Sequence, residues 1–123
     1  MRFETAFLAD QDVLIVRVQG TGDAETVPQL VAAIRSAREF RPGGAVLIDA
    51  FGTDFAPSTQ DATKLPEFFE KELPGSRLAV LVRATRQYSI ASVVETLAAR
   101  RNMPLFAVFP DREEALQWLT TKP

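Results

Sequence analysis

The chain has 123 residues, of which 46% are hydrophobic and 24% charged, and its 14 basic and 16 acidic side chains nearly balance. This composition is typical of one globular domain, which we expect to span residues 1–123, and the lack of a basic stripe argues against nucleic acid as a partner. The absence of cysteine excludes disulfides and thiolate sites, and the absence of histidine removes the usual general base and the commonest zinc ligand. We therefore expect no metal, no cofactor, no catalytic residue and no enzymatic activity.

The N-terminus and the apolar runs indicate no targeting or membrane segment. The opening residues, MRFETAFLAD, lack the basic region followed by an apolar region that a signal peptide has. No apolar run approaches the roughly 20 residues that a transmembrane helix needs. We expect a cytoplasmic protein without a transmembrane segment.

Strand and helix patterns alternate along the chain and predict an α/β fold. The fold class is a mixed five-stranded sheet with an N-terminal β-hairpin followed by right-handed βα units, and it has four main helices. In chain order, the predicted elements are strands 2–9 and 12–20, a helix from Thr26, strand 45–49, a helix from Ser58, strand 77–84, helix 87–102, strand 105–109 and helix 112–119.

Caps and apolar stripes predict details of three helices. Thr26 and Gln29 read as a capping box, and residues 41–44 (RPGG) should stop the first helix. Pro66 must kink the second helix or begin a new turn, and Asp111 should cap the last one. The inward-facing residues should be Val27, Leu30, Val31 and Ile34 in the first helix and Leu65, Phe68, Phe69 and Leu73 in the second.

Four loops should leave the sheet at the carboxyl ends of its parallel strands, where α/β folds place their ligands. These loops are residues 20–26, 49–59, 83–88 and 109–111. The second loop carries two aromatic side chains, Phe51 and Phe55, which must pack, pair or bind something. We expect Trp118 and Phe109 to lie in the core.

The second loop also carries a family resemblance. The segment DAFGTDFAPSTQ (49–60) is similar, without a gap, to the D-L-S-G-V-x-F-[IM]-D-S-S-G segment of STAS domains of the SpoIIAA type, the anti-sigma-factor antagonists. The closing segment AVFPDREEALQWL (107–119) resembles the SpoIIAA-like group more specifically. The residues that match in type are Asp49, Gly52, Phe55, Ser58 and Thr59.

The resemblance implies a fold shared with CRAL-TRIO lipid-transfer domains and a phosphoacceptor at the hydroxyl pair, Ser58 or Thr59. The chain departs from the pattern at Pro57 and Gln60, which replace an aspartate and a glycine. The hydroxyl of Ser58 also suits a helix N-cap without any phosphate.

Asp49 and a basic cluster have alternative interpretations. Asp49 could be the phosphoacceptor aspartate of a receiver domain, but the acidic pair and the lysine that receivers use with magnesium are missing. We expect its carboxylate instead to accept backbone N–H bonds in its own turn. Arg83, Arg86 and Tyr88 could clamp an anion, or they could form a solvated loop with Tyr88 as a helix anchor.

Two function classes remain. The first is a non-catalytic regulatory or protein-interaction module that docks through residues 49–59 and the following helix onto a protein partner or a second copy of itself. The second is a binder or carrier of a small apolar or amphipathic ligand. In that case the walls would be Phe51, Phe55, Phe68 and Phe69, and the head group would be held by Arg83 or Arg86.

Overall fold

Five strands form one mixed sheet in the computed structural model of the chain, which describes residues 2–22, 25–53, 64–82 and 106–121. The strands are β1 (Arg2–Leu8), β2 (Val13–Gly20), β3 (Ala45–Thr53), β4 (Arg77–Leu81) and β5 (Phe106–Phe109), and they lie in that order across the sheet. β1 pairs antiparallel with β2, and the remaining neighbours pair in parallel. The prediction of a mixed five-stranded sheet that begins with a β-hairpin is confirmed.

The hairpin of β1 and β2 keeps a continuous register over the whole of β1, from Arg2 opposite Gln19 to Leu8 opposite Val13. Its loop closes through a hydrogen bond from the Gln11 N–H to the Leu8 carbonyl, 3.2 Å long. Asp12 has a φ of 55° in this loop. Aspartate tolerates that left-handed conformation better than most residues, because its short side chain bonds locally.

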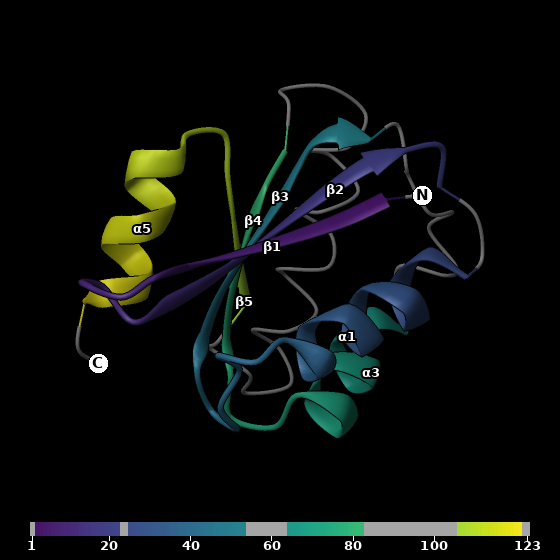
Figure 1. Ribbon diagram of the computed structural model, residues 1–123, viewed down its shortest axis with the longest axis horizontal. Coiled ribbons are helices and arrows are strands. Elements are labelled where there is room, and N and C mark those ends of the chain that lie inside the picture. The colour runs from purple at the N-terminus through teal and green to yellow at the C-terminus, as the bar shows by residue number, and fades with distance from the viewer. Residues whose placement is uncertain (1, 23–24, 54–63, 83–105, 122–123) are drawn as a thin grey trace.

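The two faces of the sheet carry separate apolar cores, since successive side chains of a strand point to opposite sides. Figure 1 shows α1 (Thr26–Ser36) and α3 (Leu65–Glu72) on one face and α5 (Arg112–Thr120) on the other. The α1/α3 face buries Leu14, Val16, Val18, Leu30, Val31, Ile34, Val46, Ile48, Phe69, Leu73 and Leu78. The α5 face buries Val13, Ile15, Leu47, Ala79, Leu81, Ala115 and Leu119. Burial on both faces explains why β2 and β3 are nearly continuous apolar runs.

Helix α1 is the amphipathic helix that the apolar stripe predicts, but its first turn differs from the prediction. Three residues of the stripe are buried and Val27 packs against the same core. The N-cap is Glu25, which makes no side-chain cap bond, and Thr26 is the first helical residue and is only 3% exposed. The predicted capping box of Thr26 with Gln29 is therefore wrong, because Thr26 is packed inside the protein instead of flanking the helix.

The end of α1 also lies earlier than predicted. The helix ends at Ser36, and Ala37 takes an extended conformation well before the RPGG stretch. Phe40 then donates its N–H to the carbonyl of Ala37 in a turn, 3.1 Å apart, and both residues pack against the α1/α3 core. Burial of these two apolar side chains favours the turn over a longer helix.

Helix α3 confirms the prediction for the second apolar stripe. Phe69 and Leu73 are buried, and Leu65 and Phe68 pack against the same core. Pro66 lies in the first turn of α3, where a missing N–H costs nothing, so it begins a turn and does not kink a helix. The predicted start of this helix at Ser58 lies outside the described residues.

The described residues contain three helices, whereas the sequence predicts four. The missing one, at 87–102, lies outside the described residues. The last helix, α5, has its predicted N-cap: the Asp111 carboxylate accepts a hydrogen bond from the Glu113 N–H, 3.3 Å long. The prediction that Phe109 and Trp118 belong to the core holds in part, because both are half-buried and pack against the α5 core.

One arginine ties the start of β4 to the end of α5. The guanidinium of Arg77 lies 4.4 Å from the ring centroid of Trp118 and donates to the carbonyl of Trp118 over 2.7 Å. It also donates to the carbonyl of Thr121. A cation bound to the last carbonyls of a helix satisfies acceptors that have no partner within the helix.

Candidate functional site

Four parallel strands end at one edge of the sheet, which we call the carboxyl edge. β2 ends there at Gly20, β3 at Thr53, β4 at Leu81 and β5 at Phe109. Of the predicted site residues, Asp49 and Phe51 belong to the described part of the chain. The others lie outside the described residues, namely Phe55, Ser58, Thr59, Arg83, Arg86 and Tyr88.

A β-bulge lies in β3 immediately after Asp49. Arg17 of β2 pairs with Asp49 and Gln19 with Gly52, so that two residues of β3, Ala50 and Phe51, face one residue of β2. Such an insertion leaves backbone groups unpaired and bends the strand, and bulges are frequent beside functional sites. Strand β3 is therefore longer than the predicted strand 45–49 and continues into the predicted loop.

Asp49 satisfies the backbone at this bulge. Its Oδ1 accepts a hydrogen bond from the Phe51 N–H over 3.1 Å. The interpretation of Asp49 as an acceptor of backbone N–H bonds in its own turn is confirmed. A bulged residue loses its ladder partner, and the carboxylate supplies a local substitute.

The second oxygen of Asp49 faces a cation on the neighbouring strand. Arg17 Nε lies 3.7 Å from Asp49 Oδ2, and the side chains are 48% and 12% exposed. Glu4 of β1 is the register partner of Arg17, so three charges of alternating sign form a row across β1, β2 and β3. Because Arg17 is half-exposed and the two atoms are 3.7 Å apart, the pair contributes little to stability. Its consequence is an arginine held at the surface beside the bulge.

The exits of β2 and β3 are joined by a side-chain bond. Thr53 Oγ1 donates to the carbonyl of Gly20 over 2.8 Å, and Gly20 has a φ of 105°. Gly52, one of the residues that match the family pattern, lies against β2: a Cβ there would be 3.0 Å from Gln19 Cγ and 3.2 Å from the Val18 carbonyl oxygen. The glycine therefore permits the close approach that brings Thr53 to Gly20.

Phe51 lies on a different side of the sheet from the phenylalanines of α3. It is half-buried and packs against the α5 core, whereas Phe68 and Phe69 pack in the α1/α3 core. The predicted ligand pocket with Phe51, Phe68 and Phe69 as common walls is wrong, because the sheet itself stands between them. Alternation along the strand groups Phe51 with Leu47 on one face, but the sequence could not reveal which helix covers that face.

Arg17 is a part of this site that the sequence prediction missed. Gly20 and Thr53 fall within the predicted loops 20–26 and 49–59, but the bond between them was not predicted. Arg17 is the one charged residue in the β2 run VLIVRVQG, and this interruption was an available signal. Its partner Asp49 was not identifiable, because the pairing depends on the register of β2 against β3. The bond between Thr53 and Gly20 likewise joins residues 33 positions apart.

Two kinds of site are not found in the described part of the chain. No group of three or more acidic side chains there could hold a metal ion. In the same residues, no helix has the length and apolar character that crossing a membrane requires.

Comparison with known proteins gives a likeness in structure. No protein-family model matches the sequence, and no curated protein matches it. The fold is similar to the crystal structure of an anti-sigma factor antagonist from Mycobacterium paratuberculosis, with a TM-score of 0.57 and 23% sequence identity. The match covers 98% of this chain and 96% of that chain. The STAS-type fold that the SpoIIAA-like resemblance implies is therefore confirmed.

Proposed function

We propose that this chain is a non-catalytic regulatory module that binds a protein partner at the carboxyl edge of its sheet. The observation that carries the proposal is the bulge in β3, where Asp49 fixes the backbone that leads into residues 49–59. The fold likeness to an anti-sigma factor antagonist over nearly the whole chain supports it, and an anti-sigma factor is the partner that this likeness suggests. Fold alone does not specify function, so the proposal depends on the site.

The bulge prepares a docking loop in two ways. It redirects β3 at the edge where the parallel strands end, and its hydrogen bonds hold both the start of the loop and its neighbour β2 in place. A loop that leaves a rigid strand loses less conformational freedom on binding than a free one. Arg17, at the surface beside the bulge, supplies a guanidinium for an acidic group on the partner.

A tagged copy purified from its own host and measured by native mass spectrometry tests the proposal. We expect a stoichiometric complex with one protein, and we expect its loss in the variants Arg17→Ala and Phe55→Ala. Glu39→Ala is the matched control, because this exposed residue precedes β3 and therefore lies at the amino ends of the parallel strands, away from the carboxyl edge. Binding that survives Arg17→Ala and Phe55→Ala but fails in Glu39→Ala would place the interface elsewhere.

The carrier function predicts a different result in the same measurement. A protein that carries an apolar or amphipathic ligand would appear as a monomer with a bound small molecule of constant mass. That result, without any protein partner, would reject the regulatory proposal. The carrier would then need walls other than the combination of Phe51 with Phe68 and Phe69, which lie on opposite faces.

A further inference from the structure

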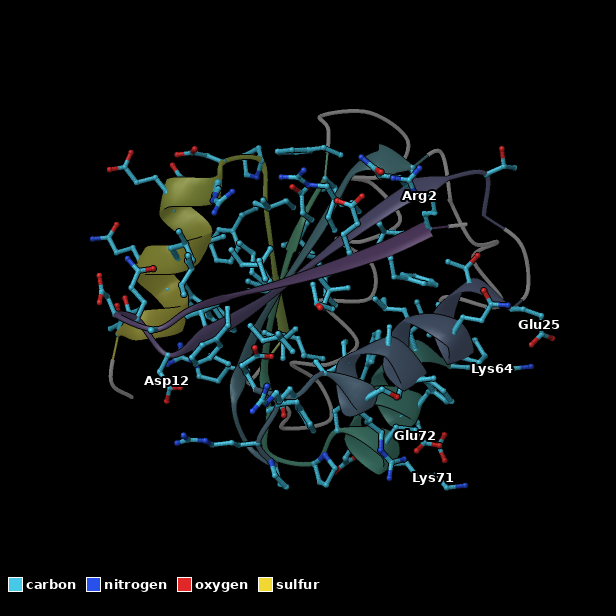
Figure 2. All side chains as sticks on the ribbon, in the orientation of Figure 1. Arg2, Asp12, Glu25, Lys64, Lys71 and Glu72 are labelled. Atoms are coloured by element: carbon cyan, nitrogen blue, oxygen red, sulfur yellow. The ribbon has the colours of Figure 1, made fainter. Side chains whose placement is uncertain are left out.

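β1 forms one edge of the sheet, and among the described residues no strand pairs with its outer side. Figure 1 is seen from this edge: β1 crosses in front of the other strands, with α5 on one side of the sheet and α1 and α3 on the other. Figure 2 shows Arg2 at one end of the hairpin and Asp12 at the other. Between these ends, alternate residues of an edge strand turn their N–H and C=O groups outward.

β1 lacks most of the features that usually prevent an edge strand from pairing with another chain. Such edges are short, bulged, covered, charged or interrupted by proline. Of these features β1 shows charge, at Arg2 and Glu4, whose side chains pair with each other over 2.9 Å. β1 has seven residues, no proline and an uninterrupted register with β2, and its middle residues Glu4, Thr5 and Ala6 are all exposed. The opposite edge strand, β5, has four residues and is of the short kind.

The sequence of β1 is complementary to itself in one antiparallel register. When Thr5 lies opposite Thr5 of a second copy, all seven residues overlap and Phe3 lies opposite Phe7 twice. Aromatic pairs and threonine pairs directly opposite each other stabilise antiparallel strands. Both phenylalanines are half-buried against the α1/α3 core, so part of each ring is available to a neighbour.

Charge also selects this register. With Thr5 at the centre, Glu4 lies opposite Ala6 and Arg2 opposite Leu8, so no like charges are directly opposed. A register centred on Glu4 would place two glutamates opposite each other, which is destabilising. A two-fold axis through the centre of the strand, normal to the sheet, keeps the two α1/α3 faces on the same side.

We propose that β1 is a self-association edge, through which two copies of the chain pair antiparallel about Thr5 into one continuous sheet. Backbone hydrogen bonds provide the attachment, and the Phe3 and Phe7 pairs set the register. The carboxyl edge stays open in this dimer, because it lies at the strand ends and not along β1. The inference does not rest on the proposed function and can fail or succeed separately.

Sedimentation equilibrium of four proteins, the unaltered chain and three variants, tests the dimer. We expect the unaltered chain to dimerise, and Thr5→Lys and Thr5→Glu each to raise the dimer dissociation constant roughly tenfold, since each opposes two like charges. An equimolar mixture of the two variants should regain the dimer, because lysine then faces glutamate. Gln11→Lys is the matched control: it adds the same charge to an exposed position in the hairpin loop and should change nothing.

Cysteine cross-linking tests the register, and the chain is suited to it because it has no cysteine of its own. Residues directly opposite in antiparallel strands have Cα atoms about 4.5–5.5 Å apart, within the range of a disulfide. Thr5→Cys should therefore cross-link to a dimer under mild oxidation, and Ala6→Cys, displaced from its own copy, should not. A monomeric unaltered chain, a dimer indifferent to Thr5→Lys, or equal cross-linking of both cysteines would overturn the proposal.

Discussion

The carboxylate of Asp49 accepts a hydrogen bond from the backbone N–H of Phe51 over 3.1 Å, and this bond spans the bulge in β3 from the residue before it to its second residue. The contact explains why an acidic residue occurs at the end of a buried apolar strand. Asp49, which matches the family pattern, therefore has a structural role. Any effect of Asp49 on partner binding would act through the backbone that its carboxylate holds in place.

The first prediction separates the hydrogen bond of Asp49 from its charge. Asp49→Ala leaves the half-buried Phe51 N–H without its acceptor and should cost about 1–2 kcal/mol in the free energy of unfolding. Asp49→Asn keeps an oxygen that can accept the bond and should cost less than about 1 kcal/mol, because the contact with half-exposed Arg17 is weak. Urea unfolding measures both. Equal losses in the two variants would mean that the ion pair, and not the hydrogen bond, holds the bulge.

The second prediction concerns the clamp that Arg77 forms on the end of α5. Lysine cannot stack on Trp118 and bind two carbonyls in the same geometry, so Arg77→Lys should cost about 1 kcal/mol and Arg77→Ala about 2 kcal/mol. Arg112→Lys, at an exposed position on the first turn of α5, is the control and should stay within about 0.5 kcal/mol. Thermal unfolding of the three variants measures the difference. A harmless Arg77→Lys would show that charge alone suffices.

The third prediction concerns how far Phe51 serves the core. Because it is half-buried on the α5 face, Phe51→Ala should cost about 2 kcal/mol, compared with about 3–5 kcal/mol for the buried Phe69→Ala. Phe51→Leu should recover most of the loss, since leucine fills much of the same volume. Denaturant unfolding gives the comparison. A negligible loss for Phe51→Ala would show that the ring contributes little to the α5 core.

Local patterns in the sequence predict most of the fold. Alternation and apolar runs locate all five strands, and the stripe from Val27 to Ile34 identifies the buried side of α1, because burial follows directly from side-chain periodicity. The residues at which helices and strands begin and end were harder to predict from the sequence. Threonine is a common N-cap residue, yet tertiary packing makes Thr26 the first residue of α1. Such a choice depends on neighbours far along the chain.

The candidate site was predictable in position but not in construction. The carboxyl edge follows from the order of strands and helices, and Asp49 stands out at the end of its strand. The bulge and the partner Arg17 both depend on how β2 and β3 align, which involves residues more than 30 positions apart. Patterns among neighbouring residues in the sequence do not indicate that register.

The fourth prediction concerns the hydroxyl pair, which lies outside the described residues. We expect no phosphate on Ser58 or Thr59, because Pro57 and Gln60 replace the aspartate and glycine of the family pattern. Intact-mass spectrometry of protein from its own host, sampled across growth phases, measures this. A fraction heavier by one phosphate and localised by fragmentation to either residue would establish a phosphorylation switch instead of a helix cap.

The last prediction concerns metal ions and the receiver-domain interpretation of Asp49. Aspartyl-phosphate chemistry needs a carboxylate free to accept phosphorus and a magnesium ion held by further acidic groups. The Asp49 carboxylate is instead engaged by the Phe51 N–H and Arg17, and the described residues contain no cluster of three acidic side chains. Beryllofluoride with magnesium should therefore leave the melting temperature unchanged, and zinc titration should release no heat, since histidine and cysteine are absent. Stabilisation that needs magnesium and beryllofluoride together, and that Asp49→Asn abolishes, would contradict the structural role and make Asp49 a phosphoacceptor.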